Sequence, residues 1–322
     1  MNKDIKTVLG ADFGYGHSKF SFGTIDGEIS KKFKFPTRIG IAKKLDNIDD
    51  SKIKEFRGHY YYVGENASHL PSEQLINIEE YKNLEYYAPL LLEHAIEIIG
   101  EVPGIITTGL SIAQIQNSGH FQANLQEFEV DKKKYKFDKV FVLPQGAGAK
   151  LCIDIYGDNF PTKQTEFLGA TTYVGVDIGM NTLDLFLVKD GEAKANLFEG
   201  IEKEGIMKIA AKIAKKVHDD HKRQITLTEA TDILDTGVYK LRGQKHDFSM
   251  YIQDVKLEYL KNILKLVNDK YPGILDKADF ISISGGGSTV FKNTKDKFIR
   301  VVQNSPEFYN SIGFFLFGLK QA

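Results

Sequence analysis

Short apolar runs broken by glycine predict β-strands at the start of the chain. Residues 5–13 and 18–25 form two such runs joined by a glycine-containing turn, and residues 29–35 predict a third strand. Residues 36–85 are more polar and rich in turn-forming residues, with one short strand predicted over 60–63. This stretch therefore has the pattern of an insertion on the first domain.

A helical pattern follows, with apolar residues recurring at helical spacing over residues 84–99. Buried strands are predicted over 104–110 and 137–143, and a helix opens after Pro144. That helix carries Cys152, the one cysteine of the chain. Its apolar surroundings predict a buried, inert thiol rather than a nucleophile. A single cysteine also excludes a disulfide framework and favours a reducing, cytoplasmic location.

The strand pattern then restarts about 165 residues after it first appeared, which indicates an internal duplication. Residues 172–177 and 183–188 predict two strands, with Gly179 between them and a turn at Asp190-Gly191. The remaining predicted elements are two helices, a strand and a last helix, over residues 201–218, 251–268, 280–284 and 306–319.

Length and charge narrow the class of protein. A chain of 322 residues is long enough for two domains or one large two-lobed domain. Lys and Arg number 42 against 43 Asp and Glu, which argues against a general nucleic-acid coat. The first residues lack the apolar block of a signal peptide, and no segment has the apolar length of a bilayer span. The apolar stretch 312–319 predicts a buried terminal helix.

Two glycine-flanked aspartates stand at the tips of the duplicated hairpins, in Asp12-Phe-Gly-Tyr-Gly and in Asp177-Ile-Gly-Met-Asn-Thr-Leu-Asp184. Glycines let a backbone approach a ligand closely, and successive amides in such a turn bind phosphate oxygens. A carboxylate beside phosphates needs a divalent cation, which it holds directly or through water. One such turn alone is more often a plain hairpin. Two copies at corresponding places of a duplicated chain are a stronger signal, and if the two halves face each other, both turns can hold one polyphosphate.

A third element is the glycine triplet of Ser282-Ile-Ser-Gly-Gly-Gly-Ser288, which directly follows a predicted strand. Bare backbone there would let a flat ring lie against it, and the alternative interpretation is a flexible loop. The phosphate-binding pattern GxxxxGK[ST] and the dinucleotide pattern GxGxxG are both absent from the sequence. The nucleotide hypothesis therefore rests on the two aspartate turns and the triplet.

Five motifs in the same order resemble the actin/hexokinase/DnaK-type ATPase superfamily, and within it the ParM/StbA-type plasmid-segregation actins. The matching stretches lie at residues 12–19, 142–147, 176–185, 284–289 and 306–313, and residues 107–110 resemble a strand end typical of bacterial actins. The resemblance implies an α/β, two-lobed, ribonuclease H-like fold with a duplicated βββαβαβα core. Lobe I would span 1–165, with an outer subdomain at about 31–88, and be completed by a helix over 305–322. Lobe II would span 166–304, with an outer subdomain at about 203–273.

The resemblance also assigns roles to residues. Asp12 and Asp177 would coordinate Mg²⁺ through water, and Gln145 would orient the attacking water. A neutral Gln is a poor proton acceptor, which suits slow hydrolysis. Asp184 would help order the water network. The implied nucleotide-binding residues are Gly14, Tyr15, Gly16, Lys19, Gly179, Met180, Asn181, Thr182, Gly285, Gly286, Gly287 and Ser288. Tyr15, His17 and the Met180-Asn181 pair are bulkier than the family's usual residues.

The implied function is a cytoplasmic ATPase that binds Mg²⁺ with ATP or GTP and polymerises with itself into filaments. The implied use is plasmid segregation through an adaptor protein on centromere-like DNA, with no direct nucleic-acid binding and no membrane. One alternative is a small-molecule kinase of the same superfamily, although no sugar-pocket signature stands out. Another is a bacterial cytoskeletal actin or nucleotide switch outside segregation. A DnaK-type chaperone would need a peptide-binding domain for which the chain has no room.

Several residues keep two interpretations. His17 would contact phosphate or lie at an exposed turn. His218 and His221 have a spacing that could bind a metal, but a solvated helix end is favoured because no third ligand follows at zinc spacing. The basic runs 132–134 and 215–216 predict solvated faces, with contact to an acidic partner or a neighbouring subunit as the weaker alternative.

Overall fold

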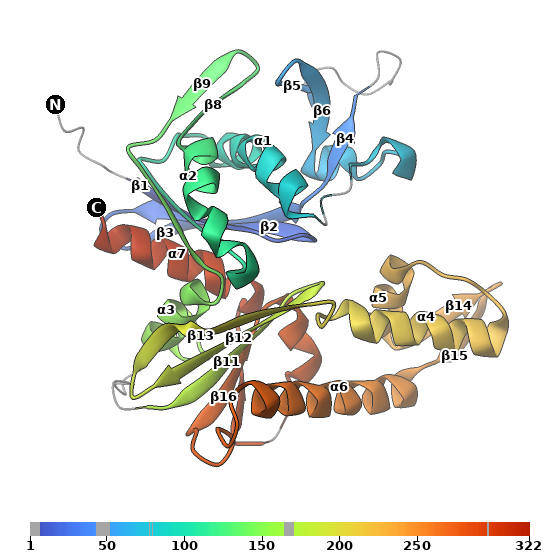
Figure 1. The fold of residues 1–322 in the computed structure, drawn as a ribbon. Coiled ribbons are helices and arrows are strands. Elements are labelled where there is room, and N and C mark those ends of the chain that lie inside the picture. Colours follow the sequence, from blue (N-terminus) through green and yellow to red (C-terminus); the bar gives the residue numbers. More distant parts are fainter. Residues whose placement is uncertain (1–6, 43–51, 77, 79, 164–170, 295) are drawn as a thin grey trace. The chain divides into compact units, whose positions relative to one another are not determined.

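The computed structural model describes residues 7–42, 52–76, 78, 80–163, 171–294 and 296–322. The chain divides into two compact units (Figure 1). Unit 1 comprises Met1–Thr165 and Glu307–Ala322, and unit 2 comprises Glu166–Pro306. The C-terminal segment thus returns to the first unit.

A five-stranded sheet with the order β3-β2-β1-β7-β10 forms the centre of unit 1. Its strands are β1 (Thr7–Phe13), β2 (His17–Thr24), β3 (Ile29–Pro36), β7 (Ile105–Leu110) and β10 (Lys139–Pro144). β1, β2 and β3 pair antiparallel, whereas β7 pairs parallel with both β1 and β10. The predicted hairpin of the first two apolar runs is therefore confirmed.

Helices cover both faces of this sheet (Figure 1). They are α1 (Tyr81–Ile99), α2 (Ser118–Gln126), α3 (Ala147–Tyr156) and α7 (Tyr309–Lys320). Leu9 and Ala11 of β1 lie in the same core cluster as the buried residues of α1, whereas Val8 packs with Phe315 of α7. Because side chains alternate along a strand, Asp12 lies on the α7 side of the sheet.

Gly10, on that same side of β1, lets α7 pack directly on the strand. A Cβ atom added at Gly10 would overlap the backbone carbonyl oxygen of Ser311 in α7. A larger residue at this position would push the helix away from the sheet.

The outer part of unit 1 consists of β4 (Ile39–Ile41), β5 (Lys54–Phe56) and β6 (His59–Val63), in the order β4-β6-β5, and the hairpin of β8 (Glu127–Val130) and β9 (Lys133–Lys136). The amide of Asp131 at the hairpin tip donates to the carbonyl of Glu55, and the Glu55 amide donates to Asp131 Oδ1. The hairpin therefore caps the edge of β5.

A charge cluster with Lys54 and Glu93 buried at its centre holds these outer elements to α1. The ammonium of Lys54 lies 3.3 Å from Glu93 Oε1 and 3.5 Å from Asp131 Oδ2, and it also bonds Glu97. Tyr135 of β9 donates to Glu93 at 3.2 Å. Burial raises the pKa of Glu93, and the charge of Lys54 opposes that shift.

Unit 2 repeats the strand order of unit 1. Its strands are β11 (Tyr173–Ile178), β12 (Thr182–Lys189), β13 (Glu192–Glu202), β16 (Phe280–Ser284) and β17 (Ile299–Val301), in the order β13-β12-β11-β16-β17. The first three again pair antiparallel, and β16 pairs parallel with β11 and β17. The predicted α/β fold with a duplicated core is confirmed.

The helices of unit 2 are α4 (Met207–His221), α5 (Leu227–Thr236) and α6 (Ser249–Lys270), with a hairpin of β14 (Val238–Leu241) and β15 (Gln244–Asp247). Buried residues of α4 and α6 share one core cluster with alternate residues of β11 and β12. Among the described residues, short 3-10 turns lie at Gly64–Ala67, Ser72–Gln74, Ile112–Asn117, Gly286–Phe291 and Pro306–Phe308.

Two predicted helices begin later than the sequence indicated. The prediction over 201–218 is wrong at its start, because residues 201 and 202 belong to β13 and the helix begins at Met207. Lys203 has a φ of 62°, a left-handed conformation that ends the strand. The predicted last helix begins with a 3-10 turn at Pro306, and α7 proper starts at Tyr309.

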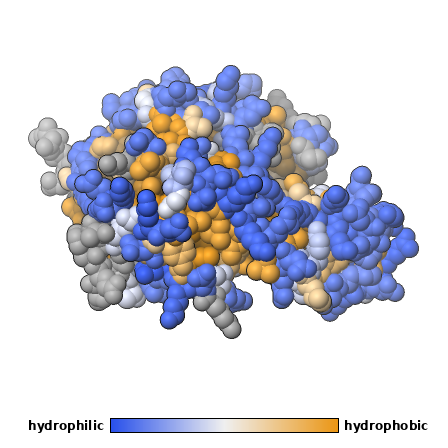
Figure 2. Space-filling model, turned by 60° about the horizontal axis from the view of Figure 1, so that its bottom comes forward, coloured by the Kyte–Doolittle hydropathy of each residue, from blue (hydrophilic) through white to orange (hydrophobic). Residues whose placement is uncertain are grey.

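The molecular surface carries both hydrophilic and hydrophobic residues (Figure 2). Figure 2 shows hydrophilic residues over much of one face and hydrophobic residues gathered in its middle. Met250 and Leu257 of α6 are among the exposed large apolar side chains. Nowhere in the described part of the chain does a helix combine the length and apolar character that crossing a bilayer requires.

Candidate functional site

The first aspartate turn brings three predicted residues together in unit 1. Asp12 stands opposite Lys19 in the β1–β2 register, so both side chains lie on the same face. Lys19 Nζ is 3.2 Å from Asp12 Oδ2. From the end of β10, Gln145 Nε2 donates to Asp12 Oδ1 at 3.4 Å. The Asp12 side chain is buried, so this ion pair is shielded from water.

The loop after β1 depends on a glycine and carries positive charge around it. A Cβ atom at Gly14 would lie 2.9 Å from both Lys19 Nζ and the carbonyl oxygen of His17. Glycine therefore gives Lys19 room to reach Asp12. Burial lowers the pKa of His17, and the charges of Lys19, Lys34 and Arg38 lower it further. The positive charges of these three side chains, unlike the burial, would favour an anion at this loop.

The second turn has the same construction in unit 2. Asp177 stands opposite Asp184, and both are buried. In each hairpin the aspartate pairs with the third residue of the returning strand, and three residues separate the two strands. The partner is a lysine in unit 1 and a carboxylate in unit 2. Ser284 of the neighbouring strand donates to Asp177 Oδ1 at 3.4 Å.

The β11–β12 turn is held against the start of α4. The amides of Gly205, Ile206 and Met207 donate to the carbonyls of Asn181, Gly179 and Met180, at 3.2, 3.1 and 3.0 Å. A trans peptide places its N–H opposite its C=O. The amides that follow Gly179 and Met180 in the chain, those of Met180 and Asn181, therefore point away from α4. Two such amides in one turn form an anion-binding concavity.

The glycine triplet lies directly beside this turn. Gly285 has a φ of 85°, and a Cβ atom there would overlap Asp177 Oδ1 and lie 2.5 Å from the carbonyl oxygen of Ile178. Ser288, at the end of the triplet, is fully buried, and its hydroxyl finds no hydrogen-bond partner among the described residues. An orphaned buried hydroxyl beside bare backbone suits a polar ligand.

The predicted site residues thus form two groups. One, in unit 1, contains Asp12, Gly14, Tyr15, Gly16, Lys19 and Gln145. The other, in unit 2, contains Asp177, Gly179, Met180, Asn181, Thr182, Asp184, Gly285, Gly286, Gly287 and Ser288.

Oxygen donors of this kind fit Mg²⁺. Among the described residues, no group of three or more His, Cys, Asp or Glu side chains is arranged to hold a metal ion. Mg²⁺ commonly binds one or two carboxylates and completes its shell with water and substrate phosphates. The donor set of Asp12, or of Asp177 with Asp184, therefore fits a magnesium ion that arrives with a nucleotide.

Sequence reasoning missed Ser18, Thr37 and Ser284. Ser18 and Thr37 are 2.8 Å apart behind the first loop. The sequence offers one signal for Thr37: it directly follows β3, the strand that pairs with β2 and so lies near the first loop. Ser284 belongs to the triplet motif, but its position opposite Asp177 follows only from the parallel register of β11 and β16.

Other candidate residues have structural surroundings. Cys152 is buried in α3, and burial raises the pKa of its thiol, so the prediction of a buried thiol is confirmed. The His221 ring is tilted against that of His246, with ring centroids 4.3 Å apart, and also lies near Tyr239.

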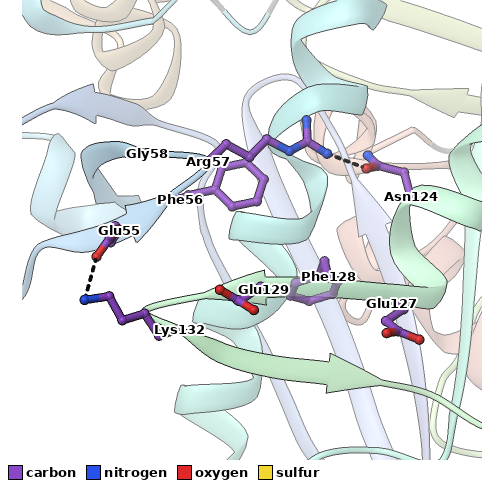
Figure 3. A pocket seen from close by; sticks show the side chains of 9 residues that line it. All are labelled: Glu55, Phe56, Arg57, Gly58, Asn124, Glu127, Phe128, Glu129 and Lys132. Carbon is purple, nitrogen blue, oxygen red and sulfur yellow. Dashed lines mark hydrogen bonds and ion pairs between the residues drawn. The ribbon is translucent and has the colours of Figure 1, made fainter.

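A pocket of about 270 Å³ lies in the outer part of unit 1, where the β5–β6 turn, α2 and β8 meet (Figure 3). The Arg57 guanidinium lies over the rings of Phe56 and Tyr86 and donates to Asn124 at 2.8 Å. The residues that line the pocket are Glu55, Phe56, Arg57, Gly58, Asn124, Glu127, Phe128, Glu129 and Lys132. None of them is a predicted site residue.

Two family models match the chain. Residues 10–148 match the model of actin-like proteins, N-terminal domain, and residues 175–296 match that of the archaeal actin homologue MreB-like, C-terminal. A search of curated proteins found no match.

Solved structures give the same fold. A 15-stranded ParM filament from Clostridium botulinum has 22% identity and a TM-score of 0.75, covering 98% of this chain and 99% of that one. Ta0583, an archaeal actin homologue in complex with ADP, has 17% identity and a TM-score of 0.73, covering 98% and 100%. Bacillus thuringiensis ParM with AMPPNP has 16% identity and a TM-score of 0.66, covering 99% of each chain.

The repeated strand order and the two matched models lead to the same assignment. The chain belongs to the actin-like superfamily.

Proposed function

We propose that this protein is a slow, magnesium-dependent nucleoside triphosphatase that assembles into filaments when it binds nucleotide. The observation that carries the proposal is the pair of equivalent hairpins in an actin-like chain, each with a buried aspartate as the last-but-one residue of the strand before a three-residue turn. The ADP and AMPPNP present in two structural relatives support a nucleotide as the ligand.

Within this proposal each unit has its own task. Asp12 in unit 1 and Asp177 in unit 2 would each offer a carboxylate that can hold Mg²⁺ through water, and the ion would neutralise charge on the phosphates. Lys19 contributes a positive charge from the strand after the first loop. The amides of Met180 and Asn181 bind phosphate oxygens, and the glycine triplet with Ser288 contacts the nucleoside.

The bond from Gln145 to Asp12 bears on hydrolysis. Because the amide nitrogen of Gln145 donates to Asp12, its amide oxygen is the end left to accept a hydrogen bond from a water. An amide oxygen orients a water molecule but does not take its proton at neutral pH. We therefore expect turnover at the slow end for nucleotide hydrolysis, with the nucleotide state acting as a timer.

Nucleotide binding controls self-assembly in this proposal, because the two equilibria are linked. A nucleotide that binds the assembling conformation more tightly shifts the population toward it, and hydrolysis reverses the shift. A head-to-tail interface that does not close generates a filament. The filament of the Clostridium botulinum relative supports this form of assembly. Plasmid segregation through an adaptor protein, with no direct contact between this chain and DNA, is the proposed use.

The test is assembly of the purified protein, measured by light scattering and by pelleting. Mg-ATP, Mg-GTP, a non-hydrolysable analogue of each, and no nucleotide are compared. We expect polymer only with nucleotide, and longer-lived polymer with an analogue. The absence of polymer under every condition, together with phosphate transfer to a small acceptor, would replace the proposal with the kinase alternative.

A further inference from the structure

Two buried hydroxyl groups lie behind the first glycine loop. The oxygens of Ser18 and Thr37 are 2.8 Å apart, and Thr37 Oγ1 donates to the carbonyl oxygen of Gly14 at 2.6 Å. Both side chains are buried. A hydroxyl has one hydrogen to donate, so Thr37, which donates to Gly14, accepts from Ser18. The result is a directed chain of hydrogen bonds from β2 through Thr37 to the loop.

The backbone of Thr37 holds the loop at a second point. Its amide donates to the carbonyl oxygen of Gly16 at 3.1 Å. Since both Gly14 and Gly16 turn their carbonyls toward Thr37, the peptide amides that follow them, those of Tyr15 and His17, point away from it. One residue thus orients two of the amides that a phosphate-binding loop uses.

The next residue ties the same segment to the outer sheet. The carbonyl oxygen of Arg38 accepts from the amide of Gly64 at 2.9 Å, immediately after β6. Ile39 then opens β4, whose partner strand is β6. Thr37 and Arg38 therefore link the loop to the β4-β6-β5 sheet through consecutive residues.

We propose that Thr37 is a positioning residue that fixes the first phosphate loop and transmits its position to the outer sheet of unit 1. The inference rests on the proposed nucleotide function and adds a route by which bound nucleotide changes the outer part of the unit. A shift of the Gly14 or Gly16 carbonyl on phosphate binding pulls on Thr37, and Arg38 carries the displacement to Gly64. The coupling then appears as a change in the stability of β5 and β6.

Thr37→Val tests the hydroxyl without changing the size of the side chain. It leaves the carbonyl of Gly14 and the hydroxyl of Ser18 without this partner, while the backbone bond to Gly16 remains. We expect the affinity for a non-hydrolysable Mg-nucleotide to fall by roughly threefold to tenfold. Thr37→Ser keeps the hydroxyl and should restore most of it. Thr231→Val is the matched control, because the Thr231 hydroxyl also donates to a backbone carbonyl, that of Leu227 in α5.

Hydrogen exchange measures the coupling itself. In the wild type, the analogue should slow amide exchange in residues 54–63. In Thr37→Val at saturating analogue this slowing should be largely lost, whereas the slowing at the loop itself remains. The same slowing of 54–63 in Thr37→Val and in the wild type would overturn the inference, as would a wild type that binds nucleotide without any change there. A wild type that binds no nucleotide would overturn the proposed function as well, and calorimetry separates the two cases.

Discussion

Gly285→Ala tests the close approach between the glycine triplet and the second aspartate turn. The new methyl group would have to occupy a backbone with a φ of 85°, which costs about 1 kcal/mol for an L-residue. It would also overlap Asp177 Oδ1 and lie 2.5 and 2.7 Å from the carbonyl oxygen and amide nitrogen of Ile178. Those backbone atoms cannot rotate away, so overpacking adds about 1–3 kcal/mol.

Gly273→Ala supplies the matched control. Gly273 has a φ of 71°, but a Cβ atom there meets nothing within 4 Å. The control therefore experiences the backbone strain without the overlap. Urea unfolding of both variants should show a loss of about 1 kcal/mol for Gly273→Ala and about 2–4 kcal/mol for Gly285→Ala. Equal losses would refute the claim that the triplet is packed against Asp177.

Three further results are expected. Lys54→Met removes the cation that neutralises the buried Glu93 carboxylate. Urea unfolding at pH 7 should show the free energy of unfolding lowered by about 3 kcal/mol. A loss below about 1 kcal/mol would contradict the stabilising role of the cluster. A hydrogen bond with His94 and bonds with Lys54 lower the pKa of Glu97 from 4.5 to about 2, so its stabilising effect is present above pH 4.5 and is lost as pH falls to 2. The stability gap between wild type and Glu97→Gln should therefore shrink over that window, and a constant gap would be the contrary result. In single-turnover assays, Gln145→Ala should slow nucleotide hydrolysis about tenfold or more. Nucleotide affinity should change by only a few-fold. An unchanged hydrolysis rate would remove Gln145 from the mechanism.

The sequence predicted the repeated hairpins well because each carries its own local signals. Alternating or continuous apolar residues marked β1, β2, β11 and β12, and glycine marked their turns. Asp190-Gly191 also forms the predicted turn, with both residues at positive φ. Such features depend on neighbours in the chain, so they can be read without the fold.

Elements whose stability comes from distant contacts were missed. β13 lies at the edge of its sheet, pairs with β12 through an irregular register and carries several charged residues. It therefore lacks the apolar pattern of a central strand. α2 buries only Phe121 and Leu125, which is too few residues to make a helical pattern evident.

In the candidate site, too, features with local sequence signals were predicted, whereas contacts between distant residues were not. Asp12, Asp177 and the glycines around them were found from motifs, whereas the approach of Lys19 to Asp12 depends on the strand register. The hydroxyl pair of Ser18 and Thr37 joins residues that are 19 positions apart. No local pattern marks such a pair, because the β2–β3 register brings it together.

The central claim is that the second aspartate turn and the glycine triplet beside it bind a magnesium nucleotide. Isothermal titration calorimetry of the purified protein with non-hydrolysable Mg-ATP and Mg-GTP analogues tests it most directly, with Asp177→Asn measured beside the wild type. The account predicts saturable, magnesium-dependent binding of at least one nucleotide and a large loss of affinity in the variant. No binding heat for either nucleotide in the folded wild type, or equal affinity in Asp177→Asn, would contradict it.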